Sequence, residues 1–96
     1  MPAGLILRFP SSVGEADYDA VSRRIGWDPR TGQGDWPAGL LSHAAGASDE
    51  GWIVTEVWDS KDAQAAFMGA RLGPALGGQP EPVVLWFDVV AAQHRH

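Results

Sequence analysis

The chain contains no cysteine, and this absence removes several kinds of chemistry at once. A protein of 96 residues without cysteine has no disulfide bond, no thiolate metal site and no thiol nucleophile. Structural disulfides belong to oxidising compartments, so their absence fits the reducing cytoplasm. We therefore expect a cytoplasmic protein without a cysteine-based site.

Basic residues are scarce and scattered along the chain. Seven Lys and Arg stand against twelve Asp and Glu, which gives a formal net charge of −5. Arg23-Arg24 is the only adjacent basic pair. Binding to phosphate backbones requires clustered positive charge, so we expect no nucleic-acid partner.

Long apolar runs and nucleotide-binding motifs are also missing. The amino-terminal stretch MPAGLILRFP is too short in its apolar part for a membrane span and has no basic leader, so we expect neither a signal peptide nor a membrane partner. The run Gly32-Gln33-Gly34 follows an expected helix rather than a strand, which excludes a dinucleotide fingerprint. Ser42 and His43 are adjacent in an expected strand, so they point to opposite faces and form no nucleophile–base pair.

Tryptophan, by contrast, is abundant. Five indoles occur among 96 residues, at positions 27, 36, 52, 58 and 86. Each offers a large apolar surface with one N–H donor, which suits cores, interfaces and the walls of pockets for aromatic ligands. Packing in a core or an interface is the simplest role for most of them.

The apolar pattern predicts four strands and two helices within one domain, residues 1–96. We expect strands at 3–9, 38–47, 52–58 and 83–90, with a turn at 48–51 joining the middle two into a hairpin. Ser12 and Glu15 have capping-box spacing and predict the start of a first helix, which Gly26 ends. Asp59-Ser60 predicts the start of a second helix that runs to about residue 71, and the spacing of Ala63, Phe67 and Ala70 gives it one apolar stripe. The segment 27–37 is expected to be a loop, a short helical turn can form at 74–76, and 91–96 is expected to be a frayed tail.

The order β-α-β-β-α-β predicts an α+β, ferredoxin-like fold. In this fold a four-stranded antiparallel sheet carries two helices on one face. The strands are apolar on both faces, for example at Ile53 and Val54. An apolar sheet face without helices is a binding surface, and a second copy of the chain is its simplest partner. We therefore expect a homodimer.

The third predicted strand and the helix after it resemble a known superfamily. The pattern is a strand that ends in an acidic-x-aromatic step, a capping Ser and a helix with an aromatic residue; here it comprises Glu56, Val57, Trp58, Asp59, Ser60 and Phe67. It resembles the dimeric α/β-barrel superfamily, and within it small antibiotic-biosynthesis-monooxygenase-like proteins. The superfamily includes cofactor-free oxygenases that act on polycyclic phenols, haem-degrading enzymes and muconolactone isomerases. The resemblance implies a dimeric α/β barrel with a ligand between sheet and helices, and no cofactor.

The chain departs from two branches of that superfamily. Haem-degrading members use an Asn, a Trp and a helical His, whereas this chain has no Asn and no His in 61–71. The phenol-oxidising members rely on Asn, Trp and Arg, so their residues cannot be carried over one by one. The activity therefore has to be argued from the residues of this chain.

His43 is the candidate catalytic residue. It is the one histidine outside the tail, where His94 and His96 lie, and it stands beside small residues. Imidazole titrates near neutral pH and suits a general base that takes a phenolic or enolic proton. A hydrogen-bonded structural role is the alternative. We expect no metal site, because no second His or Cys accompanies it.

Glu56, Trp58, Trp86, Tyr18 and Phe67 are the candidate ligand-binding residues. Glu56 and Trp58 share a strand face with Trp52, but whether His43 joins them depends on the hairpin register. Glu56 can act as an acid or base. The alternatives are a salt bridge to Arg8 or Arg71, or hydrogen bonding at the dimer interface. The alternative for the aromatic residues is packing of the core.

Together these residues predict a homodimer with an aromatic-lined pocket for a small planar organic molecule. It would act as a cofactor-free monooxygenase or isomerase on an aromatic or polyketide-like compound, with His43 as the base. The alternative is a dimer of the same fold that binds a ligand, or serves as a structural module, without catalysis.

Overall fold

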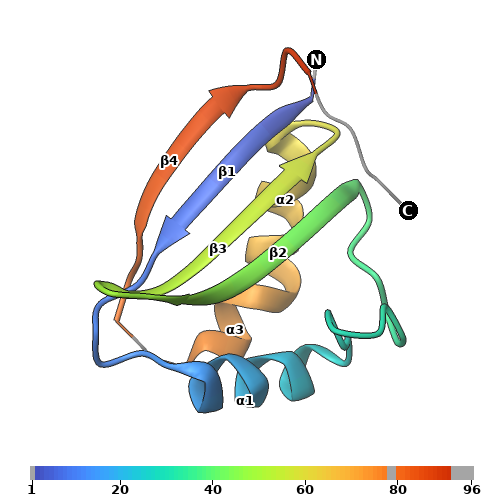
Figure 1. The fold of residues 1–96 in the computed structure, drawn as a ribbon. Coiled ribbons are helices and arrows are strands. Elements are labelled where there is room, and N and C mark those ends of the chain that lie inside the picture. The colour runs from blue at the N-terminus through green and yellow to red at the C-terminus, as the bar shows by residue number, and fades with distance from the viewer. Residues whose placement is uncertain (1, 78–79, 92–96) are drawn as a thin grey trace.

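A computed structural model of the chain describes residues 2–77 and 80–91. Its strands and helices follow the predicted order (Figure 1). In chain order the elements are β1 (Ala3–Arg8), α1 (Glu15–Ile25), β2 (Leu40–Ser48), β3 (Gly51–Trp58), α2 (Lys61–Phe67), the π-helical η1 (Met68–Leu72), α3 (Gly73–Leu76) and β4 (Val83–Asp88). The predicted tail falls largely on residues 92–96, which lie outside the described residues.

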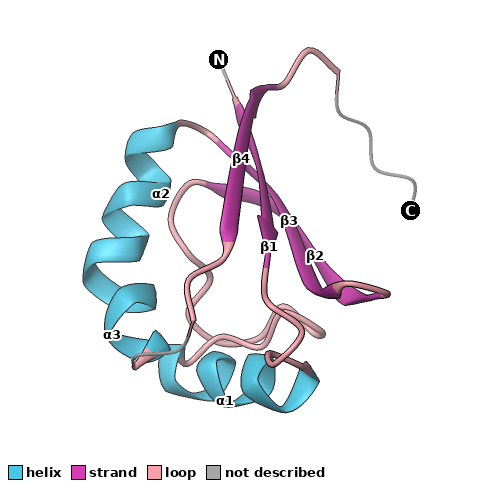
Figure 2. Cartoon of the chain, turned by 90° about the vertical axis from the view of Figure 1, so that its left-hand side faces the viewer, coloured by secondary structure: helices cyan, strands magenta, loops and turns pink. Residues whose placement is uncertain are grey.

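The four strands form one antiparallel sheet in the order β2-β3-β1-β4. Figure 2 shows the sheet nearly edge-on, with α1, α2 and α3 all on the same side of it. This arrangement confirms the predicted ferredoxin-like α+β fold. It leaves the second face of the sheet without helices.

Helix α1 begins two residues later than the capping-box spacing predicts, because Gly14 rather than Ser12 is its N-cap. Gly14 precedes the helix, and the Asp17 carboxylate accepts a hydrogen bond from the Gly14 N–H at 3.0 Å. The Ser12–Glu15 prediction was wrong because residues 10–13 form a turn, closed by the Val13 N–H and the Pro10 carbonyl at 2.9 Å. That turn buries Val13 before the helix starts. Gly26 ends the helix with a φ of 83°, as predicted.

The second helix begins as predicted and then widens. The Ser60 hydroxyl caps α2 by accepting the Ala63 N–H at 3.1 Å. After Phe67 the chain passes through η1, where the Gly73 N–H bonds back to the Met68 carbonyl, and α3 follows without a break. A π-helical turn holds more residues than an α-helical turn, so it changes which side chains face inward. Ala70 is therefore exposed, and the predicted Ala63–Phe67–Ala70 stripe was wrong at this position.

The β2–β3 hairpin decides the position of His43. Ser48 pairs with Gly51, so only two residues form the turn. Counting back from that pair places His43 directly opposite Glu56, on the helix-covered face. A β-bulge at Leu41 absorbs one extra residue farther along β2.

The core lies between the sheet and the helices. Leu5, Val54 and Trp58 are among its most buried side chains, and Trp58 is completely inaccessible. On the uncovered face, Phe87 packs its ring over Gly4 of the neighbouring strand, where a Cβ atom would collide with it. Val83, Leu85 and Phe87 remain exposed along β4 on this face. Within the described residues, no helix is long and apolar enough to cross a membrane.

Candidate functional site

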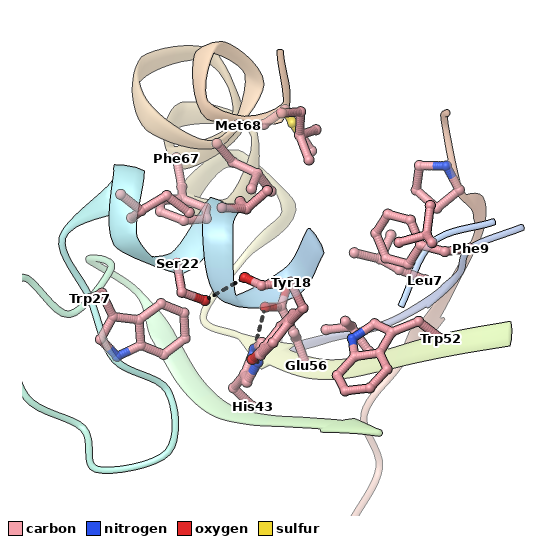
Figure 3. A pocket seen from close by; sticks show the side chains of 17 residues that line it. Leu7, Phe9, Tyr18, Ser22, Trp27, His43, Trp52, Glu56, Phe67 and Met68 are labelled. Carbon is pink, nitrogen blue, oxygen red and sulfur yellow. Dashed lines mark hydrogen bonds and ion pairs between the residues drawn. The ribbon is translucent and has the colours of Figure 1, made fainter. Parts of the chain in front are cut away.

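A cavity of about 90 Å³ lies between the helix-covered face of the sheet and the helices (Figure 3). We call it the central cavity. Its lining is mostly apolar and comes from every helical segment and from β1, β2 and β3. The lining residues are Leu7, Phe9, Val13, Tyr18, Val21, Ser22, Ile25, Trp27, His43, Trp52, Val54, Glu56, Phe67, Met68, Leu72, Leu76 and Pro82.

A chain of hydrogen bonds runs along one wall of the central cavity. The Tyr18 hydroxyl lies 2.5 Å from His43 Nε2, and His43 Nδ1 lies 2.7 Å from Glu56 Oε2. The second carboxylate oxygen, Glu56 Oε1, accepts the indole N–H of Trp58 at 3.0 Å. The side chains of His43 and Glu56 are each only 7% exposed. Four of the six predicted site residues, Tyr18, His43, Glu56 and Trp58, therefore form one network, in which Tyr18 is half-buried and the other three form its buried part.

The partners in this network fix the proton positions on the imidazole. A carboxylate only accepts hydrogen bonds, so His43 Nδ1 carries the proton that it donates to Glu56. In the neutral ring, Nε2 is then the acceptor for the Tyr18 hydroxyl. Glu56 thus holds His43 in the tautomer whose basic nitrogen faces Tyr18, the arrangement by which a carboxylate orients a catalytic imidazole.

Tyr18 stays protonated in this environment. Burial raises the pKa of Tyr18 from 10.0 to about 12, and the negative charge of Glu56 adds to this effect. The neutral phenol donates its one proton to His43 and keeps its oxygen lone pairs available. It can therefore accept a hydrogen bond from a ligand hydroxyl while it is bonded to the imidazole.

Neither arginine considered as a partner of Glu56 reaches it. Arg8 pairs with Glu50 at the surface, and Arg71 donates to the backbone carbonyls of Ile25 at 3.0 Å and Asp35 at 2.7 Å. The salt-bridge interpretation of Glu56 was therefore wrong. The reason is the hairpin register, which places His43 opposite Glu56 and gives the carboxylate a nearer partner.

The aromatic residues divide into those that line the cavity and those that lie outside its lining. Phe67 lines it and packs against Trp58, with ring centroids 5.6 Å apart. Trp58 itself lies beneath the cavity wall, where it orients Glu56 rather than forming a wall. Trp86 sits on the edge strand β4, packs against the core and receives the Lys61 ammonium over its ring. The geometry therefore places neither Trp58 nor Trp86 on the cavity surface.

Two other tryptophans line the cavity in their place. Trp52 packs against Tyr18 with ring centroids 5.2 Å apart, and Trp27 meets His43 edge-on at 5.0 Å. The period-two pattern of β3 places Trp52 on the same face as Glu56, so the sequence carried a signal for it. Trp27 is buried although it lies at the start of a loop, and only the fold reveals this. Trp36 covers Trp27 from outside and is 43% exposed.

A second hollow, of about 380 Å³, shares Tyr18, His43 and Trp52 with the central cavity. Small side chains of β2 form part of its lining: Ala44, Ala45 and Ala47. The three shared residues border both spaces, so a ligand in either one contacts the same hydrogen-bonded network. Within residues 2–77 and 80–91, no group of three or more acidic or His side chains is arranged to hold a metal ion.

Comparisons with known proteins support the fold. No protein-family model and no curated protein matches the sequence. Among solved structures, the chain is similar to SnoaB, a cofactor-independent oxygenase from Streptomyces nogalater, with a TM-score of 0.64 and 15% identity over 95% of each chain. It is also similar to Rv0793 from Mycobacterium tuberculosis, with a TM-score of 0.67 and 16% identity over 98% of this chain and 100% of that one. At 15% and 16% identity, these two likenesses support the ferredoxin-like fold that the sequence predicts.

Proposed function

We propose that this protein binds a small planar aromatic molecule in the central cavity and that His43 is the base that removes its hydroxyl proton by way of Tyr18. The observation that carries the proposal is the Tyr18–His43–Glu56 chain of hydrogen bonds in a wall that is otherwise apolar. An oriented imidazole beside an apolar cavity is the arrangement that general-base catalysis requires.

The proton moves through Tyr18. The ligand hydroxyl donates a hydrogen bond to the Tyr18 oxygen. Tyr18 passes its own proton to His43 Nε2 and at the same time takes up the proton of the ligand. Because the pKa of Tyr18 is about 12, a free tyrosinate is costly, so both protons move together. The imidazolium that forms is stabilised by the Glu56 carboxylate at 2.7 Å.

Cofactor-free oxygenation is the reaction that we favour. The deprotonated ligand is an electron-rich phenolate or enolate, and such an anion can give electrons directly to dioxygen. In the keto tautomer of such a ligand, the hydroxyl-bearing carbon is already a carbonyl and a second ring carbon, ortho or para to it, is a CH₂ group. The balanced reaction converts that CH₂ group and O₂ into a new carbonyl and water, so one oxygen atom enters the ligand and the other leaves as water. SnoaB, which has the same fold, is described as a cofactor-independent oxygenase.

The size of the central cavity limits the ligand. Its volume of about 90 Å³ is below the roughly 150 Å³ of a cavity that holds benzene. It is also well below the roughly 300 to 1,000 Å³ that is usual for ligand pockets. A single ring therefore enters only when lining side chains move, and a polycyclic compound also needs Tyr18 or Trp52 to move and join the cavity to the hollow beside β2.

The assembly and location that we propose rest on other features. We propose a homodimer formed through the uncovered sheet face, where Val83, Leu85 and Phe87 are exposed. We place the protein in the cytoplasm because its sequence has no cysteine.

The test is a panel of hydroxylated aromatic compounds, with binding followed by tryptophan fluorescence and turnover by oxygen uptake. His43→Gln and Tyr18→Phe should each lower oxygen uptake by ~10²-fold or more, while binding changes only a few-fold. Trp86→Phe, outside the cavity lining, is the matched control and should behave as wild type. Full oxygen uptake by His43→Gln would rule out the proposed base.

A second function is favoured by one feature of the same network. Both His43 nitrogens and both Glu56 oxygens already have partners within the protein, as in a purely structural cluster. In that case the protein binds its ligand without converting it. Quenching of fluorescence without oxygen uptake or product, across the whole panel, would establish this alternative.

A further inference from the structure

Two buried indole N–H groups have no hydrogen-bond partner among the described residues. They belong to Trp27, which is 5% exposed, and Trp52, which is 8% exposed. Leaving a donor unsatisfied in an apolar interior costs free energy, and buried Trp N–H groups are normally paired. Each such group therefore points to a partner that the chain itself does not supply.

The two indoles differ in what their nitrogens face. Figure 3 shows the nitrogen of Trp52 on the ring edge that faces the open centre of the pocket. The nitrogen of Trp27 lies on the ring edge that is turned away from the centre. Both rings line the central cavity, and only the Trp52 donor lies on the cavity side of its ring. Its nitrogen is covered by neighbouring atoms, so a ligand reaches it only when an adjacent side chain moves. Trp52 also borders the hollow beside β2.

The charges of the lining define the kind of acceptor that fits. Among the 17 described residues that line the central cavity there is no Lys or Arg, and the one carboxylate is Glu56. A carboxylate or phosphate on the ligand would thus be buried beside a like charge without a counter-ion. An uncharged oxygen, such as a ketone or quinone carbonyl, can accept the Trp52 N–H without that cost.

We propose that Trp52 is a specificity-determining residue, whose N–H binds a neutral carbonyl oxygen on the same ligand whose hydroxyl meets Tyr18. The ligand class is then a neutral hydroxylated aryl ketone or quinone rather than a simple phenol or an aromatic acid. This assignment rests on the proposed function, because it assumes that the central cavity is the ligand site. Tyr18 packs against Trp52 at 5.2 Å, so the acceptor for the hydroxyl and the donor for the carbonyl lie on adjacent side chains.

Three probes with the same number of non-hydrogen atoms isolate the carbonyl. They are 4-hydroxyacetophenone, 4-isopropylphenol and 4-hydroxybenzoate, each measured together with its 3-hydroxy isomer by titration calorimetry. The wild-type protein should bind the better acetyl isomer about 3- to 10-fold more tightly than its isopropyl counterpart, the effect of one net hydrogen bond. The benzoate should bind more weakly than both, because its charge is buried near Glu56.

Two variants test whether the tighter binding of the acetyl probe, compared with the isopropyl probe, depends on the Trp52 indole. Trp52→Phe should bind the acetyl and isopropyl probes equally, whereas Trp86→Phe, outside the cavity lining, should keep the wild-type preference. A second measurement uses the wild-type protein, so no substitution changes the cavity. In an NMR titration the Trp52 indole N–H resonance should shift with the acetyl probe and stay in place with the isopropyl probe.

Each result has a definite meaning. If Trp52→Phe still prefers the acetyl probe to the isopropyl probe, the proposed role of Trp52 is overturned. The same holds if this preference is lost in Trp27→Phe alone. Equal binding of acetyl and isopropyl probes by the wild-type protein would overturn the carbonyl inference but leave the cavity as a ligand site. Binding of none of the probes would overturn both this inference and the proposed function.

Discussion

Tyr18 is the one tyrosine in the chain, so its ionisation can be measured without interference from another phenol. Burial and the charge of Glu56 raise its pKa to about 12. A spectrophotometric titration of tyrosinate absorbance should therefore have its midpoint near pH 12 rather than 10. After unfolding in denaturant, the midpoint should return to the ordinary value. A midpoint near 10 in the folded protein would show that Tyr18 is not held beside His43 and Glu56.

The same shift makes stability depend on pH. The folded state keeps the Tyr18 proton at pH values where the unfolded chain has lost it. The raised pKa of Tyr18 therefore contributes to the free energy of unfolding in full below pH 10, and this contribution is lost as the pH rises towards 12. Denaturant unfolding between pH 9 and pH 12 (roughly the window that linkage sets) should reveal the loss. Tyr18→Phe has no phenol to ionise and should lack this part of the pH dependence.

The sequence contains most of the site, but its geometry depends on the hairpin. Alternation along β3 is enough to place Glu56, Trp58 and Trp52 on one face. The position of His43 depends on the length of the turn, because a one-residue change reverses the face. The turn has two residues and not four, and Gly51 permits it: its φ is 135°, and a Cβ there would lie 2.6 Å from the Phe9 carbonyl oxygen.

At the scale of elements, the types were predictable and several ends were not. The strands and helices follow from apolar periodicity and from caps such as Ser60. The start of α1 did not follow, because burial of Val13 requires a turn before the helix. The π-helical η1 also leaves no clear mark in the sequence, yet it directs Met68 and Leu72 to the central cavity. Part of the cavity wall therefore depends on a change of helical pitch that sequence spacing does not reveal.

At the scale of the whole molecule, the proposed dimer forms through the uncovered sheet face. Ile53 lies on this face, opposite Arg8 of β1, whereas Val54 is buried on the helix side. Ile53→Lys should therefore break the dimer, because it places an unpaired charge in the interface while the core stays intact. Sedimentation velocity should give a dimer for the wild type and a folded monomer for Ile53→Lys.

Val54→Lys is the matched contrast for that experiment. It places the charge between sheet and helices, so it should destabilise the fold itself, by about 3 kcal/mol or more. Unfolding followed by circular dichroism separates the two effects. A wild-type protein that remains monomeric at micromolar concentration would end the dimer proposal.

The central claim is that His43 presents an unprotonated Nε2 to Tyr18 and, through it, to a ligand in the central cavity. The most direct test is ¹⁵N NMR of the imidazole nitrogens at neutral pH, with and without 4-hydroxyacetophenone and with His43→Gln to identify the signals. We predict a proton on Nδ1, an acceptor resonance for Nε2, and a shift of Nε2 when the probe binds. A proton on Nε2, or a resonance that does not move at saturating probe, would contradict the account.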